Sequence, residues 1–165
     1  MLPTEVRVGW VFRYAYLWDW QHREGREEGD KDRPCLVLAI MTTTEEGAAV
    51  VRVLPITHTP PTNPVEAIEI PAAIKARLRL DDERSWIVLT ESNRFVWPGP
   101  DLRNVDNDSG YYGALTPSLF TEVKRRFVAI ARGEVSTHAP QLVQAQTASS
   151  EMRFSIGTSV SPVFR

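Results

Sequence analysis

Two apolar segments, residues 33–41 and 48–57, are separated by a short polar stretch with one glycine, and this arrangement constrains the fold more than any other feature. The first segment reads Arg-Pro-Cys-Leu-Val-Leu-Ala-Ile-Met and the second reads Ala-Ala-Val-Val-Arg-Val-Leu-Pro-Ile-Thr. Short apolar runs bounded by turn residues are typical of buried strands. A polar connection of about six residues containing glycine favours a hairpin between them. We therefore predict a β-hairpin at the centre of a sheet.

Further strands are expected on both sides of this hairpin. Residues 6–18 are rich in aromatic and β-branched side chains, which favours a long first strand with its even-numbered positions inward and Arg13 outward. Segments 65–70, 85–91 and 94–97 are shorter strand candidates, the last two separated by Ser92-Asn93. Residues 19–32 are densely charged and predict a solvated loop, which at this length is typical of functional or disordered segments.

Two helices are expected. Pro71 begins a short one, because proline is tolerated in the first turn. The stronger signal follows Thr116 as N-cap and Pro117 at the first helical position, and Gly133 lies just past its end. An apolar stripe runs between these signals, at Leu119, Phe120, Val123, Phe127, Ile130 and Ala131.

The order of these elements predicts a mainly β fold with helices (α+β), a small barrel or sandwich with a C-terminal amphipathic helix packed on it. We expect one folded domain over residues 1–133. Residues 134–165 are rich in Gln, Ser, Thr and Ala and are expected to form a flexible tail, although the ending around residues 154–164 also fits an edge strand or a partner contact.

Charge and cysteine content restrict the function classes. The chain has 19 basic and 21 acidic residues and a net charge of −2, so anion binding must rest on a local basic patch, and no duplex DNA binding is expected. The single cysteine, Cys35, lies in an apolar run and has no internal disulfide partner. The N-terminal residues do not form a signal peptide, and no apolar stretch is long enough to span a bilayer. We expect a cytoplasmic protein without membrane contact.

The usual signatures of chemistry are missing from the sequence: it has no glycine-rich phosphate loop, no His-Glu-x-x-His, no Cys-x-x-Cys and no Gly-x-Ser-x-Gly. What remains is an arrangement of strand ends. The charged loop leads into Arg33 at the start of one strand, and the next strand ends on Thr57-His58-Thr59.

In this arrangement the chain resembles the MazF/PemK family of bacterial toxins. The likeness runs over residues 8–130 and rests on the order of short motifs: Gly9 in a first strand, an R-P-x-x-V-L strand from Arg33, a strand ending P-I-T at Thr57, a short strand at 66–70, and a V-L-x-E-x-x-R segment from Val88 to Arg94. The segment 95–103 departs from the family pattern, which normally has an aspartate and a second arginine there.

The resemblance implies an SH3-like barrel, a homodimer and a metal-independent endoribonuclease that cleaves single-stranded RNA at short sequences. It implies no cofactor and a cognate antitoxin protein as inhibitor. The two residues it carries over as catalytic are Arg33 and Thr57. A guanidinium suits stabilisation of charge on phosphate oxygens, and a hydroxyl suits positioning by hydrogen bonds. Neither is a conventional base at neutral pH, so the proton acceptor stays unassigned.

Four further residues are RNA-binding candidates: Trp20, His22, His58 and Arg94. His58 follows Thr57 and has the chemistry of a proton acceptor, but adjacent strand residues face opposite ways, which favours an ordinary surface histidine. Exposed aromatic rings stack on bases, yet most of the five tryptophans are expected in the core, with Trp20 as the exposed exception. For Arg33 a purely structural position is an equal alternative before the resemblance is counted.

Two other functions stay open. The altered 95–103 segment and the long tail fit a catalytically inactive toxin-fold module that binds RNA or a protein partner. A gyrase-directed toxin of the related CcdB type is disfavoured, because those proteins end in Trp-Gly-Ile and this chain ends in Pro-Val-Phe-Arg. A purely structural protein is the remaining possibility.

Overall fold

The computed structural model describes residues 1–165 except 28, 30, 136–140, 145–153 and 158–165. The elements, in chain order, are β1 (Trp10–Tyr14), α1 (Asp19–Arg23), β2 (Arg33–Thr43), β3 (Ala49–Thr57), a 3₁₀ turn η1 (Pro64–Glu66), β4 (Ala67–Glu69), α2 (Ala72–Arg77), β5 (Trp86–Val88), β6 (Glu91–Val96), β7 (Leu102–Arg103), β8 (Tyr111–Ala114), α3 (Pro117–Ala131), β9 (Gln141–Gln144) and β10 (Phe154–Gly157). The protein is a mainly β α+β fold, as predicted.

The central hairpin of the sheet is the predicted pair β2 and β3, with Cys35 opposite Pro55. β1 continues the sheet beside β2, and β7 and β8 both pair with β1. On the other side, β3 pairs with β6 along its first half and with β5 at its end, and β5 also pairs with β4. All pairs among β1–β8 are antiparallel, whereas β9 joins β6 in parallel and β10 pairs with β9.

The sheet curls around an aromatic core. Tyr14 of β1 and Phe95 of β6 stack with ring centroids 4.8 Å apart, although β2 and β3 lie between their strands. Adjacent strands are about 4.8 Å apart, so a flat sheet would separate these rings by roughly three strand spacings. Only strong bending brings them together. Phe12, Trp97 and Tyr111 complete this buried cluster.

The curled sheet is nevertheless open, and the predicted closed barrel is wrong. Among the described residues, no strand pairing joins β1 to β6. A side chain spans that gap instead: Asn93 Oδ1 accepts from the Leu17 amide at 3.1 Å, and Asn93 Nδ2 donates to the Leu17 carbonyl at 2.8 Å. The chain leaves β1 after Tyr14, earlier than predicted, so the backbone groups of Leu17 are satisfied by an amide side chain rather than by a strand.

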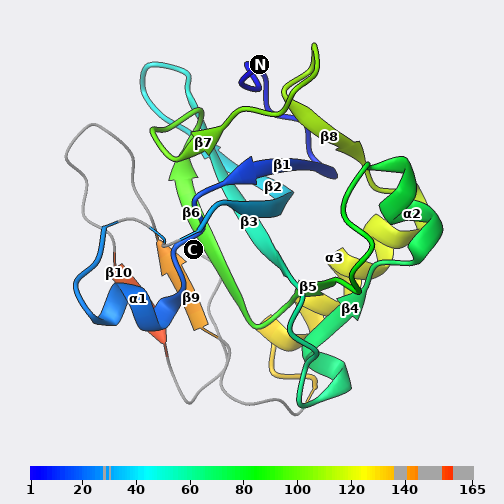
Figure 1. Ribbon diagram of the computed structural model, residues 1–165. Helices are drawn as coiled ribbons and strands as arrows, with labels where there is room; N and C mark the ends of the chain where they lie inside the picture. The colour runs from blue at the N-terminus through cyan, green and yellow to red at the C-terminus, as the bar shows by residue number, and fades with distance from the viewer. Residues whose placement is uncertain (28, 30, 136–140, 145–153, 158–165) are drawn as a thin grey trace.

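The other face of the sheet is covered by helices. Figure 1 shows α2 and α3 together on one side of the sheet, while α1 lies on the opposite side near β9 and β10. Val123, Phe127 and Ile130 of α3 pack onto an aliphatic core that includes Leu36 and Leu54. The N-cap prediction is confirmed, because Thr116 Oγ1 accepts from the Leu119 amide.

Two segments differ from the sequence predictions. The predicted charged loop contains the short helix α1, in which Arg23 pairs with the buried Asp19 at 2.8 Å, one turn apart. Ser92 and Asn93 lie inside β6 rather than between two strands. Within the predicted tail, 141–144 and 154–157 are paired strands, and most of the remaining tail lies outside the described residues.

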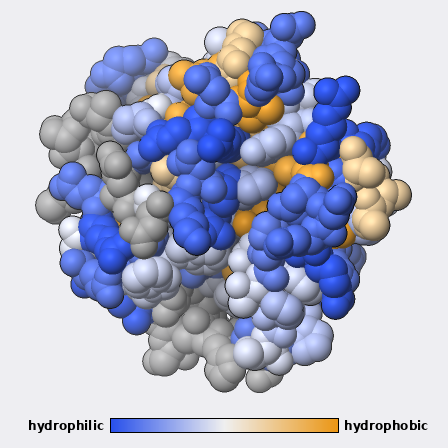
Figure 2. Space-filling model, in the orientation of Figure 1, coloured by the Kyte–Doolittle hydropathy of each residue, from blue (hydrophilic) through white to orange (hydrophobic). Residues whose placement is uncertain are grey.

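Most of the face shown in Figure 2 is hydrophilic, and the apolar residues visible there form small, separated patches. Five large apolar side chains of the described residues are exposed: Met1, Leu2, Val8, Trp20 and Ile40. In the part of the chain that the structure describes, no helix combines the length and apolar character that a membrane crossing requires.

Candidate functional site

Arg33 and Thr57 line the same cavity. Arg33 is the first residue of β2 and Thr57 the last of β3, and continuing the register of Cys35 with Pro55 by two residues places them opposite each other. The cavity has a volume of about 420 Å³, and residues 80, 81 and 85 form its other wall. The start of one strand of the hairpin and the end of the other therefore meet at one concave site.

An aromatic ring lies against Arg33 in this cavity. The guanidinium carbon of Arg33 lies 4.7 Å from the ring centroid of Trp18, a cation–π contact. Its Nε is buried and has no hydrogen-bond partner among the described residues. A buried donor without a partner is costly unless a ligand satisfies it. Lys31, Asp32 and Asp81 also line the cavity, so its charges are mixed, and Arg33 is the group there that suits a phosphate oxygen.

His58 lines the same cavity, and it is a half-exposed histidine after the end of β3, in contact with two carboxylates. Its side chain is 49% exposed. Its Nε2 lies 2.8 Å from Asp81 Oδ2, and its Nδ1 lies 3.1 Å from Glu83 Oε2. The β3 strand ends at Thr57, so alternation no longer governs the direction of the next side chain.

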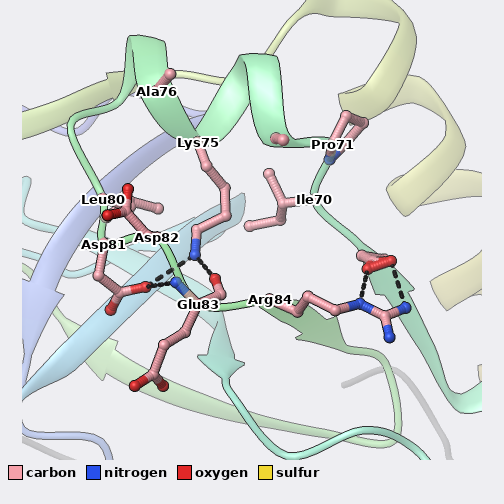
Figure 3. Close-up of a pocket in the computed structure, with 11 residues that line it drawn as sticks. Ile70, Pro71, Lys75, Ala76, Leu80, Asp81, Asp82, Glu83 and Arg84 are labelled. Carbon is pink, nitrogen blue, oxygen red and sulfur yellow. Dashed lines mark hydrogen bonds and ion pairs between the residues drawn. The ribbon is translucent and has the colours of Figure 1, made fainter.

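Asp81 is fixed in turn by Lys75 of α2. Figure 3 shows Lys75 Nζ directed at Asp81 and at the main-chain carbonyl of Glu83, and its distance to Asp81 Oδ1 is 2.9 Å. Lys75 is buried, and the Asp81 carboxylate also accepts from the Glu83 amide at 3.1 Å. The hydrogen bond from Lys75 is the main reason that the pKa of Asp81 lies below its usual value. Asp81 is therefore a fixed anion.

This network borders a second cavity of about 410 Å³, which is drawn in Figure 3. Asp81 and Leu80 line both this cavity and the one that contains Arg33. Across the second cavity, Arg84 pairs with Glu69 through two hydrogen bonds of 2.8 Å each. Two ion pairs therefore border the second cavity, Lys75 with Asp81 and Arg84 with Glu69.

A third cavity, of about 430 Å³, adjoins the Arg33 cavity through Thr57 and Thr59, which line both. Its walls include Trp18, Trp20 and Glu91. Trp20 is 51% exposed, as predicted from the sequence. Arg33 lines one of these two adjoining cavities and Trp20 the other, and the two together are called the cleft below. Trp86 and Trp97, by contrast, are buried, as expected for core tryptophans.

Glu91 is the functional candidate that the sequence analysis did not single out as a site residue. It begins β6, and its Oε1 accepts from the Asp19 amide at 3.3 Å. Burial raises the pKa of the Glu91 carboxyl to about 7, against the opposing effects of the Tyr16 hydroxyl, the Asp19 amide and the Arg33 charge. A carboxyl group that titrates near neutrality suits proton transfer at physiological pH. The V-L-x-E-x-x-R motif contained Glu91, but spacing carries no information on burial.

Two predicted RNA-binding candidates lie apart from this cleft. Among the described residues, neither His22 nor Arg94 lines any of the three cavities. His22 lies in α1. Arg94 lies opposite the buried Arg52 in the β3–β6 pair, and the pKa of Arg52 falls to about 10 because of burial first and the Arg94 charge second.

The described residues contain no group of three His, Cys, Asp or Glu side chains arranged to hold a metal ion. The site available for chemistry is instead a set of single groups: a guanidinium, a hydroxyl, a carboxyl that titrates near pH 7 and a histidine between two carboxylates.

The fold and cleft define a class: an open, curled antiparallel sheet backed by a C-terminal helix, with a cleft that contains Arg33 and Trp20 at the ends of its central hairpin. No family model, no curated protein and no solved structure matches the chain. The resemblance to the MazF/PemK family therefore stays a prediction, and the function is argued from the residues of the cleft.

Proposed function

We propose that the protein is a metal-independent endoribonuclease that cleaves single-stranded RNA. The observation that carries the proposal is the Arg33 guanidinium in a cavity shared with Thr57, where its buried Nε has no hydrogen-bond partner among the described residues. A phosphodiester oxygen satisfies such a donor, and a guanidinium matches phosphate geometry. The resemblance to MazF/PemK toxins, drawn from the order of sequence motifs, leads to the same chemistry independently.

The reaction uses the 2′-hydroxyl of the RNA as nucleophile. Its oxygen attacks the adjacent phosphorus, its proton passes to the Glu91 carboxylate, and the bond from phosphorus to the 5′-oxygen breaks. The products are a 2′,3′-cyclic phosphate and a 5′-hydroxyl. Glu91 supplies the proton acceptor that Arg33 and Thr57 lack, because its pKa of about 7 keeps it both ionised and basic at neutral pH. Arg33 stabilises the charge on the phosphate oxygens.

The aromatic end of the cleft suits an unstacked base. Trp20 is exposed, and together with Trp18 and Pro60 it lines the cavity next to Thr57. Bases of single-stranded RNA stack on such rings, whereas paired bases are not available to them. This favours a single-stranded substrate over a duplex.

The resemblance adds two proposals about assembly: a homodimer and inhibition by an antitoxin whose extended segment fills the same cleft. Size-exclusion chromatography with light scattering tests the first. Competition between RNA and the candidate antitoxin for the purified protein tests the second.

The test of the nuclease proposal is cleavage of a long single-stranded RNA in the presence of EDTA. We expect wild-type protein to cut it into fragments with 2′,3′-cyclic phosphate ends. Arg33→Ala should reduce the rate about 100-fold or more, as removal of a group that stabilises transition-state charge does. Arg132→Ala, on an exposed arginine at the end of α3, is the matched control and should keep the wild-type rate.

Absence of cleavage by soluble, folded wild-type protein contradicts the nuclease proposal. In that case RNA binding by the wild-type protein, lost in Arg33→Ala, would support the alternative of a catalytically inactive binding module.

A further inference from the structure

We propose that His58 is the proton donor to the leaving 5′-oxygen and that Asp81 and Lys75 position it. The inference rests on the proposed nuclease function and adds a second catalytic residue to it. The reaction described above leaves a negatively charged 5′-oxygen, and protonation of that oxygen in the transition state makes it a better leaving group.

Each ring nitrogen of His58 lies near a carboxylate. A neutral imidazole has one N–H, whereas the imidazolium has two. Both ring nitrogens of His58 lie within hydrogen-bond distance of a carboxylate oxygen, Nε2 at 2.8 Å from Asp81 and Nδ1 at 3.1 Å from Glu83. Only the imidazolium donates to both. The two contacts place His58 as a donor, which is the role that the proposal assigns to it.

The contact of His58 with Asp81 is more firmly held than its contact with Glu83. Asp81 is anchored by the buried Lys75 and by the Glu83 amide, so its bond fixes the ring through Nε2. The Glu83 side chain is 72% exposed, and water competes with its contact to Nδ1. The proposal assigns the Nδ1 proton to the leaving oxygen, and this transfer requires RNA to displace the Glu83 carboxylate from Nδ1. The contact with Asp81 is the arrangement by which a carboxylate orients a catalytic imidazole.

The cleft also places the acid and the base on different sides of Thr57. Thr57 lines both adjoining cavities, whereas His58 lines only the Arg33 cavity and Glu91 lines only the Trp20 cavity. A displacement at phosphorus has its attacking and leaving oxygens roughly in line on opposite sides. A phosphate held at Arg33 and Thr57 then has its 2′-oxygen toward Glu91 and its 5′-oxygen toward His58.

The proton balance of the step is complete. Glu91 gains the proton of the 2′-hydroxyl, and His58 loses its Nδ1 proton to the 5′-oxygen as the phosphorus–oxygen bond breaks. Water then exchanges a proton between the two residues, and no other reactant is needed. The charged groups that face His58 are Asp81 and Glu83, and Lys31, Asp32 and Arg33 share its cavity.

The experiment compares two RNA oligonucleotides that carry the wild-type cleavage site, one with the ordinary linkage and one with a sulfur atom in place of the 5′-bridging oxygen. A thiolate leaves without protonation, so it removes the need for an acid. We expect His58→Ala to cleave the ordinary linkage about 100-fold or more slowly and the sulfur linkage at close to the wild-type rate. His58→Gln, a more conservative change, should behave in the same way.

Glu91→Gln is the matched variant, because a lost proton acceptor should slow both linkages. Equal losses on the two linkages in both His58 variants would overturn the role of His58, as would an unchanged rate on the ordinary linkage. A wild-type protein that cleaves neither oligonucleotide, nor long RNA, overturns the nuclease proposal itself, so the two failures are distinguishable.

Discussion

Arg33 shows how one residue acquires a functional setting from its neighbours. Trp18 lies under its guanidinium at 4.7 Å, and its Nε is left without a partner among the described residues. An arginine with a structural role at the end of a sheet usually donates hydrogen bonds to carbonyls or carboxylates. The aromatic ring contacts the group without using its Nε hydrogen bond, which favours the site role over the structural alternative.

The pH dependence of cleavage should report Glu91. Its raised pKa of about 7 means that the carboxyl is mostly protonated below neutrality and cannot accept the 2′-hydroxyl proton. We expect the single-turnover rate to rise with pH in proportion to the ionised fraction of Glu91, up to about pH 7. In Glu91→Gln this rise should disappear together with most of the activity. A rise that persists unchanged in Glu91→Gln would assign it to another group.

The free energy of unfolding should also depend on pH through Glu91, and it should fall as pH rises. Because the folded pKa of Glu91 lies above the unfolded value, the folded state favours the protonated carboxyl. That contribution is fully present below the unfolded pKa and is lost as pH rises through about 7. Glu91→Gln should therefore gain stability relative to wild type between pH 5 and 8, by about 1–3 kcal/mol. Urea unfolding of wild type and Glu91→Gln at pH 5 and at pH 8 measures this difference in the free energy of unfolding.

At this scale the sequence singled out Arg33 and Thr57 only through the family resemblance, and the hairpin between their strands was predicted from the two apolar patterns. It did not predict the role of Glu91 or the contact of His58 with Asp81. Burial of a strand-end carboxyl depends on α1, which packs where a loop was expected, and Asp81 lies in a connection whose path no periodicity encodes.

At the scale of elements, the ends of the central hairpin matter more than its length. β2 and β3 form one edge of the cleft, and the segment between α2 and β5 forms another. The cleft thus depends on how the open sheet is held in its curl. Asn93, which bridges β6 to the chain after β1, is the residue that replaces a missing strand pair.

Asn93→Ala should therefore destabilise the fold more than the same substitution does at an exposed position. It leaves the buried amide and carbonyl of Leu17 without partners, and each unsatisfied buried group costs about 1–3 kcal/mol. We expect a loss of about 2–4 kcal/mol in the free energy of unfolding, measured with urea. Asn104→Ala, the same change at an exposed position, is the control and should change stability little. Equal effects of the two substitutions would show that the hydrogen bonds of Asn93 to Leu17 do not stabilise the fold.

The helices show which elements local sequence determines. α3 has its N-cap, its first-position proline and its apolar stripe, and the structure confirms all three. α1 has no such stripe and depends on the pair of Asp19 with Arg23 and on burial against the sheet. The closed barrel was wrong because closure requires β1 to continue past Tyr14 and pair with β6, a long-range event that strand propensity does not determine.

At the scale of the whole molecule, the net charge of −2 makes the local character of the cleft decisive. The field of the protein as a whole does not attract a polyanion, so RNA must be gathered by a few cations at one place. Lys31 and Arg33 are the two basic residues that line the cavity. A protein of this kind should bind RNA with a shallow salt dependence and should bind duplex DNA weakly.

The salt dependence of binding gives this expectation a number. For single strands, the logarithm of the binding constant falls with the logarithm of salt concentration by about 0.7 for each phosphate contacted. Two cavity cations correspond to a slope of about −1.4, and Arg33→Ala should reduce its magnitude by about 0.7.

Fluorescence anisotropy with a short labelled RNA whose 2′-hydroxyls are methylated measures binding without cleavage. Arg132→Ala, far from the cavity residues in sequence and on the exposed end of α3, should leave the slope unchanged. A steep slope that neither variant alters would show that RNA is held by a basic surface outside the cleft.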